Sequence, residues 1–221
     1  MDLMEAMKNR HSVRSYEVRK IEGDVKDKLQ QLINDYNKES GLNIQLVLDE
    51  PSAFDSLIMH YGRFSGVRNY IAMVGRKTDD FEEKCGYYGQ KIVLYAQQLG
   101  LNTCWVGAGY KKIKNAFTVG TDEKLCVLIA IGYGHTQGKA HRSKAFQQVC
   151  SVSGTVPDWF RNGVEAALLA PTATNQQKFQ FLLDGNRVYT KPGIGFFTKV
   201  DLGIAKYHFE IGANKENFAW A

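Results

Sequence analysis

The segment Arg10-His11-Ser12-Val13-Arg14 gathers two guanidinium groups, an imidazole and a hydroxyl group within five residues. Arginine can bind phosphate oxygens through two parallel hydrogen bonds, and a serine hydroxyl with neighbouring backbone N–H groups can complete an anion cradle. The segment is therefore a candidate phosphate-binding strip. The alternative is a solvated basic turn, because short basic runs usually decorate protein surfaces.

A second polar segment, APTATNQQKF at Ala170–Phe179, lies between two apolar stretches. Its amide and hydroxyl groups suit an aromatic heterocycle that carries several carbonyl and ring-nitrogen positions. An ordinary polar connection between a helix and a strand explains the same composition, since Pro and Asn are common in turns.

Two further segments are weaker candidates. The apolar run at 103–106 ends in Gly107-Ala108-Gly109, where small residues would let a flat ligand lie against the backbone. A simple joint between helix and strand is the alternative. Four basic residues follow a later strand: Lys139, His141, Arg142 and Lys144. They could form a second anion-binding site, and a charged surface loop is the alternative.

Several familiar motifs are absent from the sequence. It contains no GxGxxG opening a helix after a strand, no GxxxxGK[ST] and no GxSxG, so neither a dinucleotide-binding Rossmann unit, a P-loop nor a hydrolase elbow is indicated. The four cysteines form no CxxC pair and have no zinc-ligand spacing; they are Cys85, Cys104, Cys126 and Cys150. We expect buried, reduced thiols and no metal site.

Composition narrows the class of protein. The chain has 221 residues, 44% hydrophobic and 23% charged, which is typical of a globular protein. Its net charge of +5 comes from dispersed basic residues, so nucleic-acid binding is not favoured. No apolar run approaches the roughly 20 residues of a membrane span, and the opening residues do not resemble a secretory signal. We therefore expect a cytoplasmic protein with neither nucleic acid nor membrane as a partner.

Hydrophobic periodicity predicts interleaved helices and strands. Helices are expected at 2–9, 25–36, 81–99, 157–168 and 200–211, and strands at 42–48, 70–75, 103–106, 125–131, 179–183 and 187–190. We expect Asp24 to cap the second helix, Gly41 to end it, and Asp184-Gly185 to form a tight hairpin turn. The pattern indicates helices packed on a mixed sheet. The polar stretch 135–154 is the best candidate boundary.

Taken together, these segments resemble the FMN-dependent nitroreductase family. RHSVRSY is similar to the family's R-[RH]-S-[VI]-R-x-[FY] start, and GYYGQKIVLYAQQLGLNTCWVG resembles its long central helix followed by G-L-G-x-x-W-x-G. LIAIGYG and HRSKAFQQV resemble a later strand and a basic tail. APTATNQQKFQF is similar to the A-P-S-x-x-N-x-Q-P-W-x-F segment.

The order of these segments departs from the usual family pattern. In most members the A-P-S-x-x-N-x-Q segment follows soon after the R-x-S-x-R start, whereas here it appears only at 170–179, with Lys178 and Phe179 in place of the proline and aromatic residue. This order resembles a less common branch. The implied fold is α+β, a mixed, largely antiparallel sheet flanked by helices. Residues 1–150 would form the main flavin-binding part, and residues 151–221 would complete the site.

The resemblance also implies an assembly. In the family each flavin lies at a dimer interface, with the two segments contributed by different subunits. We expect the C-terminal third to supply the second half in cis, so that one chain forms a pseudo-dimer. A homodimer remains the alternative.

The resemblance assigns roles residue by residue. Arg10, His11, Ser12 and Arg14 would hold the FMN phosphate and ribityl chain, and Arg142 would be a late phosphate contact, with Lys139 a weaker candidate. Val106 and Gly107 would lie near flavin N5. The isoalloxazine ring would be bordered by Pro171, Thr172, Ala173, Asn175 and Gln177.

The implied activity is an oxidoreductase that passes electrons from NAD(P)H through FMN to a small-molecule acceptor such as a nitroaromatic, a quinone or a similar electrophile, in a ping-pong hydride mechanism. The flavin would carry out the chemistry, so no catalytic side chain is named. The alternative is a flavin-binding module for storage or sensing without turnover.

Overall fold

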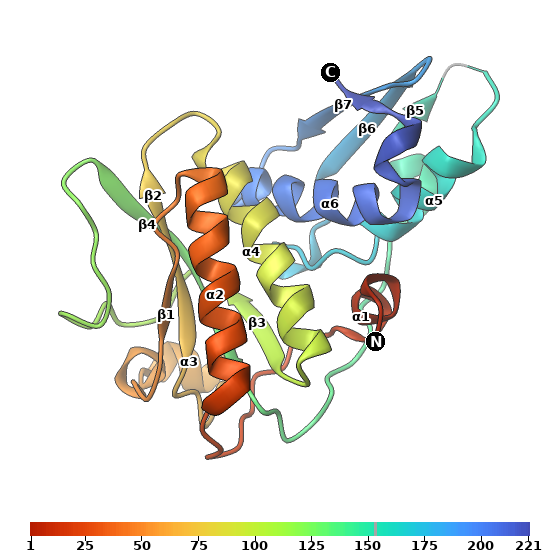
Figure 1. Cartoon of the computed structure of the whole chain (residues 1–221). Helices are drawn as coiled ribbons and strands as arrows, with labels where there is room; N and C mark the ends of the chain where they lie inside the picture. The colour runs from red at the N-terminus through yellow and green to blue at the C-terminus, as the bar shows by residue number, and fades with distance from the viewer. Residues whose placement is uncertain (153) are drawn as a thin grey trace. The chain divides into compact units, whose positions relative to one another are not determined.

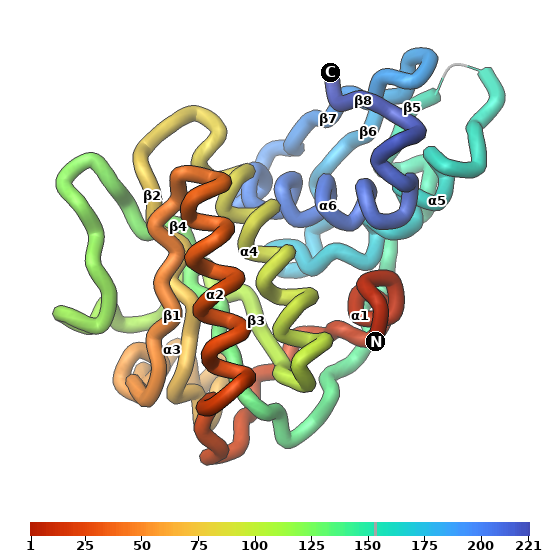
Figure 2. The backbone as a smooth tube through the Cα atoms, viewed as in Figure 1, coloured from red at the N-terminus to blue at the C-terminus, as the bar shows by residue number. Residues whose placement is uncertain are grey.

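The computed structural model describes residues 1–152 and 154–221, which form two compact units (Figure 1). One unit comprises residues 9–81 and 92–139, and is called here the strip unit. The other comprises residues 1–8, 82–91 and 140–221, and is called here the loop unit. The tube in Figure 2 follows the chain from one unit to the other and back. The expected division into residues 1–150 and 151–221 stays a prediction, since it concerns which segments complete a flavin site.

The strip unit is built on a four-stranded antiparallel sheet in the order β1-β2-β4-β3. Its strands are β1 (Gln45–Val47), β2 (Tyr70–Arg76), β3 (Asn102–Val106) and β4 (Glu123–Gly132). Its other elements are α2 (Gly23–Ser40), the short helices η1 (Ser52–Phe54) and α3 (Leu57–Tyr61), and the C-terminal part of α4 (Phe81–Gln98).

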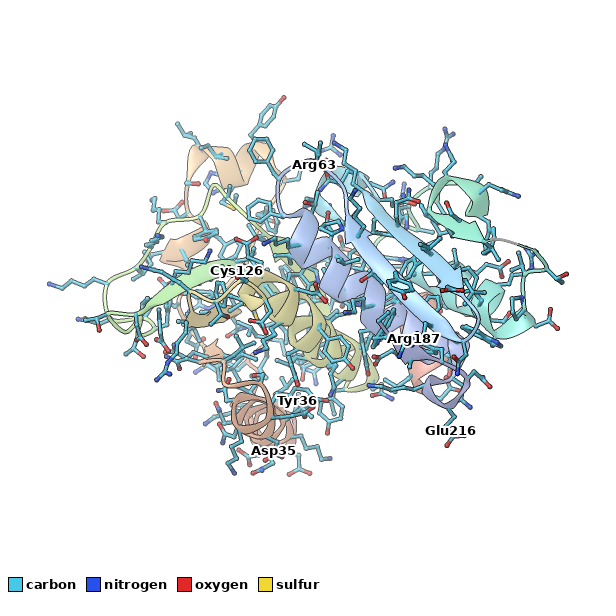
Figure 3. All side chains as sticks on the ribbon, turned by 90° about the horizontal axis from the view of Figure 1, so that it is seen from above. Asp35, Tyr36, Arg63, Cys126, Arg187 and Glu216 are labelled. Atoms are coloured by element: carbon cyan, nitrogen blue, oxygen red, sulfur yellow. The ribbon has the colours of Figure 1, made fainter. Side chains whose placement is uncertain are left out.

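Both faces of this sheet are covered. The run from Tyr70 to Gly75 in β2 is fully buried, as an uninterrupted apolar strand predicts. Tyr70, Ala72 and Val74 pack into one apolar cluster with Phe54 and Leu128. Helix α2 lies along the opposite face (Figure 1). Its exposed Asp35 points away from the sheet in Figure 3, whereas its Tyr36 is half-buried.

The loop unit contains a second four-stranded sheet, in the order β5-β6-β7-β8, with an antiparallel central pair and parallel outer pairs. Its strands are β5 (Cys150–Val152), β6 (Phe179–Asp184), β7 (Arg187–Pro192) and β8 (Ala219–Trp220). Its helices are α1 (Leu3–Asn9), η2 (Phe146–Gln148), α5 (Asp158–Ala167), η3 (Ala173–Asn175), α6 (Thr198–Ala213), η4 (Lys215–Asn217) and the N-terminal part of α4.

An aromatic core holds the loop unit together. Strand β6 alternates between buried and exposed residues, so one face of the sheet carries Phe179 and Phe181 inward. Phe181 stacks on Phe209 of α6 with ring centroids 4.8 Å apart, and Trp220 lies 5.4 Å from Phe209. Helix α6 lies along this sheet (Figure 1) and packs against both the sheet and α5.

Glycines on both helices allow one close crossing, between α4 and α6, inside the loop unit. A Cβ at Gly203 of α6 would collide with the backbone of Glu83 and Tyr87 in α4, and a Cβ at Gly86 would collide with the carbonyl of Val200. The crossing also carries an ion pair between Lys206 and Glu83. The backbones of α4 and α6 therefore touch, with no room for a methyl group between them.

Most expected elements are confirmed with shifted ends. The α+β class with largely antiparallel sheets is confirmed, and the strands form two separate sheets. Gly41 ends α2 in the left-handed conformation, at φ 71°. The Asp24 cap is wrong, because Glu22 occupies that position without a side-chain bond and Asp24 lies in the first turn. Strand β5 and the late strand β8 were not expected, since each has only two or three residues.

The four cysteines are free thiols within the described ranges. Three are buried and Cys126, labelled on β4 in Figure 3, is half-buried. None of the helices in the part of the chain that the structure describes combines the length and the apolar character that a membrane span needs.

Candidate functional site

The basic strip runs beside the strand that leads to Gly107. Ser12 pairs with Thr103 of β3 in a parallel bridge, and the Val13 N–H donates to the Thr103 carbonyl at 3.0 Å. Farther along, the Tyr16 hydroxyl donates to the Val13 carbonyl at 2.6 Å. These bonds fix the strip against the sheet. The candidate phosphate ligands and the candidate N5 contacts, Val106 and Gly107, therefore lie along neighbouring segments of one unit.

Arg10 is a buried cation, and one of its nitrogens has no hydrogen-bond partner in the part of the chain that the structure describes. Arg10 is 3% exposed, and this buried nitrogen is its Nε. Burial lowers the pKa of Arg10 from 12.5 to about 10, so the group remains charged at neutral pH. A buried positive charge with an unsatisfied N–H lowers the stability of the fold, so an anion that binds this group would be favoured.

Ser12 and Cys104 lie beside the two arginines. Burial raises the pKa of the Cys104 thiol, while the charge of Arg14, a hydrogen bond from Ser12 and the charge of Arg10 act in the opposite direction. Cys104 was not singled out from the sequence. Its place on β3 opposite the strip shows only once the pairing of Ser12 with Thr103 is known.

His11 and Ser12 are approached closely by the turn after β4. Gly138 has φ 75°, and a Cβ there would lie 2.8 Å from Cβ of His11 and 3.1 Å from the Ser12 carbonyl oxygen. Only glycine fits this position without a shift of the backbone. Arg14 is exposed, with its guanidinium carbon 5.7 Å from the centroid of the Phe64 ring. Val106 is buried and Gly107 half-buried.

The predicted ring-binding loop, Pro171–Gln177, belongs to the loop unit. There the carbonyl of Arg142 accepts from Asn175 Nδ2 at 2.9 Å and from Gln177 Nε2 at 2.8 Å. Gln177 is 2% exposed, and its Oε1 accepts from the Lys144 N–H at 2.8 Å. Arg142, Asn175 and Gln177, to which the family resemblance assigned roles, thus lie together.

This loop has a strained backbone. Thr174, Asn175 and Gln177 have φ values of 51°, 56° and 44°. Each non-glycine residue in this region costs roughly 1–2 kcal/mol, and such outliers gather at functional sites when the surroundings hold them. The Thr172 hydroxyl contributes by accepting from the Gln177 N–H at 3.0 Å. Pro171 is buried, Thr172 and Ala173 are half-buried, and Asn175 is exposed.

A carboxylate that sequence reasoning missed holds the other side of the loop. Asp201, in the first turn of α6, is 3% exposed. Its Oδ1 accepts from the Ala173 N–H at 2.9 Å and its Oδ2 accepts from Gln176 Nε2 at 2.7 Å. Burial raises its pKa from 3.8 to about 6, although both hydrogen bonds lower it. An acidic residue among the apolar positions of the helix was the only signal in the sequence.

Two of the four candidates for a second anion-binding site, His141 and Lys144, are bonded to backbone carbonyls. His141 Nε2 and the Ser143 hydroxyl both donate to the Leu168 carbonyl at the end of α5, at 2.9 and 3.0 Å. The Lys144 ammonium donates to the Gln177 carbonyl at 3.0 Å. The Arg142 side chain is exposed, whereas Lys139 is an exposed residue of the strip unit.

The sequence as a whole matches a family model. The model described as "Putative TM nitroreductase" matches residues 2–213 of this chain. The chain belongs to this nitroreductase family. Among curated proteins, none matches it.

Solved nitroreductase structures share the fold. A structure described as a putative nitroreductase from Thermotoga maritima has 25% identity and a TM-score of 0.71, covering 98% of this chain and 85% of that one. A putative NADH dehydrogenase/NAD(P)H nitroreductase from Parabacteroides distasonis has 20% identity and a TM-score of 0.53, over 66% of this chain and 95% of that one. A nitroreductase-like protein from Bacillus cereus has 17% identity and a TM-score of 0.51, over 67% and 94%. The last two comparisons concern the fold alone.

Members of the nitroreductase family are generally oxidoreductases, and the sequence expectation of an oxidoreductase is confirmed at that level. The strip and the loop lie in different units of the chain. Completion of one flavin site by both segments of a single chain stays a prediction, as do the roles assigned to the individual site residues.

Proposed function

We propose that this nitroreductase is an FMN-dependent oxidoreductase that passes electrons from NAD(P)H to a nitroaromatic, a quinone or a similar electrophile. When bound, FMN supplies the hydride-transfer chemistry of the reaction. The residues of this chain bind and orient the cofactor. We also propose that the protein works in the cytoplasm, as a homodimer or as an in-chain pseudo-dimer.

The observation that carries the proposal is the buried Arg10. Its Nε has no partner in the described residues, and its charge lies next to Ser12 and Arg14 on the same strip. Two guanidinium groups and a hydroxyl group match the oxygens of a phosphate monoester. The turn at Gly138 packs closely against His11 and Ser12 and so helps to hold this part of the strip in place.

The loop supports the ring-binding half of the proposal. Arg142 and Asn175 are both exposed, and the backbone of Asn175 and its neighbours is held in a strained shape by internal hydrogen bonds. A rigid loop loses little conformational entropy when a flat ring binds against it. Gly107, at the end of β3, would leave its backbone N–H accessible to the ring edge.

The test begins with the colour and the turnover of the purified protein. We expect a yellow protein with the absorption bands of oxidised flavin, which oxidises NADH or NADPH when a quinone or nitroaromatic acceptor is added. Flavin bound without any NAD(P)H oxidation would point instead to the storage or sensor alternative. A colourless protein that takes up no added FMN would contradict the proposal.

A further inference from the structure

Asp201 is a buried carboxylate whose only partners in the described residues are in one loop. Its two oxygens accept from the Ala173 N–H and from Gln176 Nε2, at 2.9 and 2.7 Å. No ion pair compensates its charge within the described ranges of the chain. The group is 3% exposed, so it exchanges its hydration for these two bonds.

Gln176 extends this contact to a second segment. The same Nε2 that donates to Asp201 also donates to the Phe196 carbonyl at 2.8 Å. Phe196 precedes Phe197, which has φ 58° and whose carbonyl accepts from the Asp201 N–H at 2.9 Å. Asp201 and Gln176 therefore join the loop at 173–177 to the start of α6.

The carboxylate form matters because two donors face it. An asparagine at position 201 could still accept from the Ala173 N–H. Its own amide NH₂ would then point at the Gln176 NH₂, and turning Gln176 over would point its oxygen at the Phe196 carbonyl. Only a group with two acceptor oxygens satisfies all three partners at once.

We propose that Asp201 is a positioning residue of the flavin site, which holds the loop at 173–177 in the shape that receives the isoalloxazine ring. This inference rests on the proposed function. Asp201 does not touch the ring; it acts through Ala173 and Gln176, whose backbone carries the neighbouring Asn175. The strained φ values at Thr174, Asn175 and Gln177 persist because Asp201 holds one side of the loop and Arg142 and Lys144 hold the other.

The raised pKa of Asp201 agrees with this role. Burial makes the ionised group unfavourable for folding at neutral pH, so the carboxylate is retained at a cost in stability. Residues that reduce stability in this way are expected where a loop must be held for function.

The experiment is an FMN titration of the apoprotein with Asp201→Asn, Gln176→Ala and the double variant. The matched control is Asp158→Asn, an exposed acid in the first turn of α5 in the same unit. We expect Asp201→Asn to raise the Kd for FMN by about tenfold, the effect of losing one charge-assisted bond. Gln176→Ala should act in the same direction, and the double variant should bind no more weakly than Asp201→Asn. The control should bind like wild type.

A second readout separates positioning from general destabilisation. At saturating FMN, the visible circular dichroism of the bound flavin should change in Asp201→Asn, because the ring environment changes, and should stay unchanged in Asp158→Asn. If wild type binds FMN and the Asp201 and Gln176 variants bind it equally well with the wild-type spectrum, the inference is wrong. If wild type binds no FMN, the proposed function fails, and this inference fails with it.

Discussion

At the scale of single residues, the protein keeps two charges in places where burial makes them costly. Arg10 has an unpaired Nε, and Asp201 has no counter-ion within the described residues. Unpaired buried charges destabilise a fold, and their replacement by apolar groups is often neutral or stabilising. We interpret both charges as features of ligand binding. Replacing either one by a neutral side chain should therefore weaken FMN binding without lowering the stability of the apoprotein at neutral pH.

Arg10→Met tests this for the strip. Methionine fills much of the same space without a charge, so the apoprotein should unfold at the same temperature as wild type or a higher one. FMN affinity should fall by about tenfold or more, because a charge-assisted bond to phosphate is lost. Thermal unfolding and FMN titration measure the two effects. A large fall in unfolding temperature with unchanged FMN affinity would show that Arg10 is structural.

Asp201 predicts a pH dependence of stability with a definite sign. Its folded pKa of about 6 is above the ordinary 3.8, so the folded state binds the proton more tightly. The stabilisation from this group is complete below pH 3.8 and is lost as the pH rises through about 6; it amounts to about 3 kcal/mol. The unfolding free energy of wild type relative to Asp201→Asn should therefore fall between pH 4 and 7 in denaturant titrations. A difference that is constant with pH would contradict the assignment.

At the scale of elements, the close contact of α4 and α6 and the hydrogen bonds of Asp201 hold the candidate ring-binding loop in place. The sequence predicted the helices and the longer strands because their apolar residues repeat with a clear period. It could not predict β8, whose partner β7 lies far back along the chain, nor the loop's contact with Asp201. The residue types made the strip and the loop candidates, but only the family resemblance favoured a binding role over an ordinary basic turn and an ordinary polar loop.

Gly203→Ala tests the crossing of α4 and α6. A methyl group would collide with the backbone of Glu83 and Tyr87, so the helices must move apart. Alanine favours a helix by about 1 kcal/mol over glycine, but overpacking typically costs about 1–3 kcal/mol, so we expect net destabilisation in urea unfolding. Gly120→Ala is the control, because only the flexible Glu123 side chain faces that Cβ. Equal stability of both variants would show that the crossing is not tight.

At the scale of the whole molecule, the central question is whether one chain completes a flavin site by itself. The candidate ligands divide between the two units, with Arg14 in one and Asn175 in the other. The late position of the APTATNQQKF segment is the sequence feature that led us to expect completion in cis.

Mixed subunits test this arrangement. Arg14→Ala and Asn175→Ala chains, co-expressed with different tags and purified as a pair, each lack one half of the proposed site. Completion in cis predicts that the pair binds FMN no better than either variant alone. Recovery of FMN binding in the pair would show that a site draws on two subunits.

The most direct test of the account is the difference in affinity between FMN and riboflavin, which lacks the phosphate. With Arg10 and Arg14 both bonded to phosphate, we predict that the apoprotein binds FMN about 100-fold or more tightly than riboflavin. Arg14→Ala should reduce this ratio by weakening FMN binding while leaving riboflavin binding unchanged. Equal affinities for the two flavins in wild type would contradict the claim that the basic strip anchors a phosphorylated flavin.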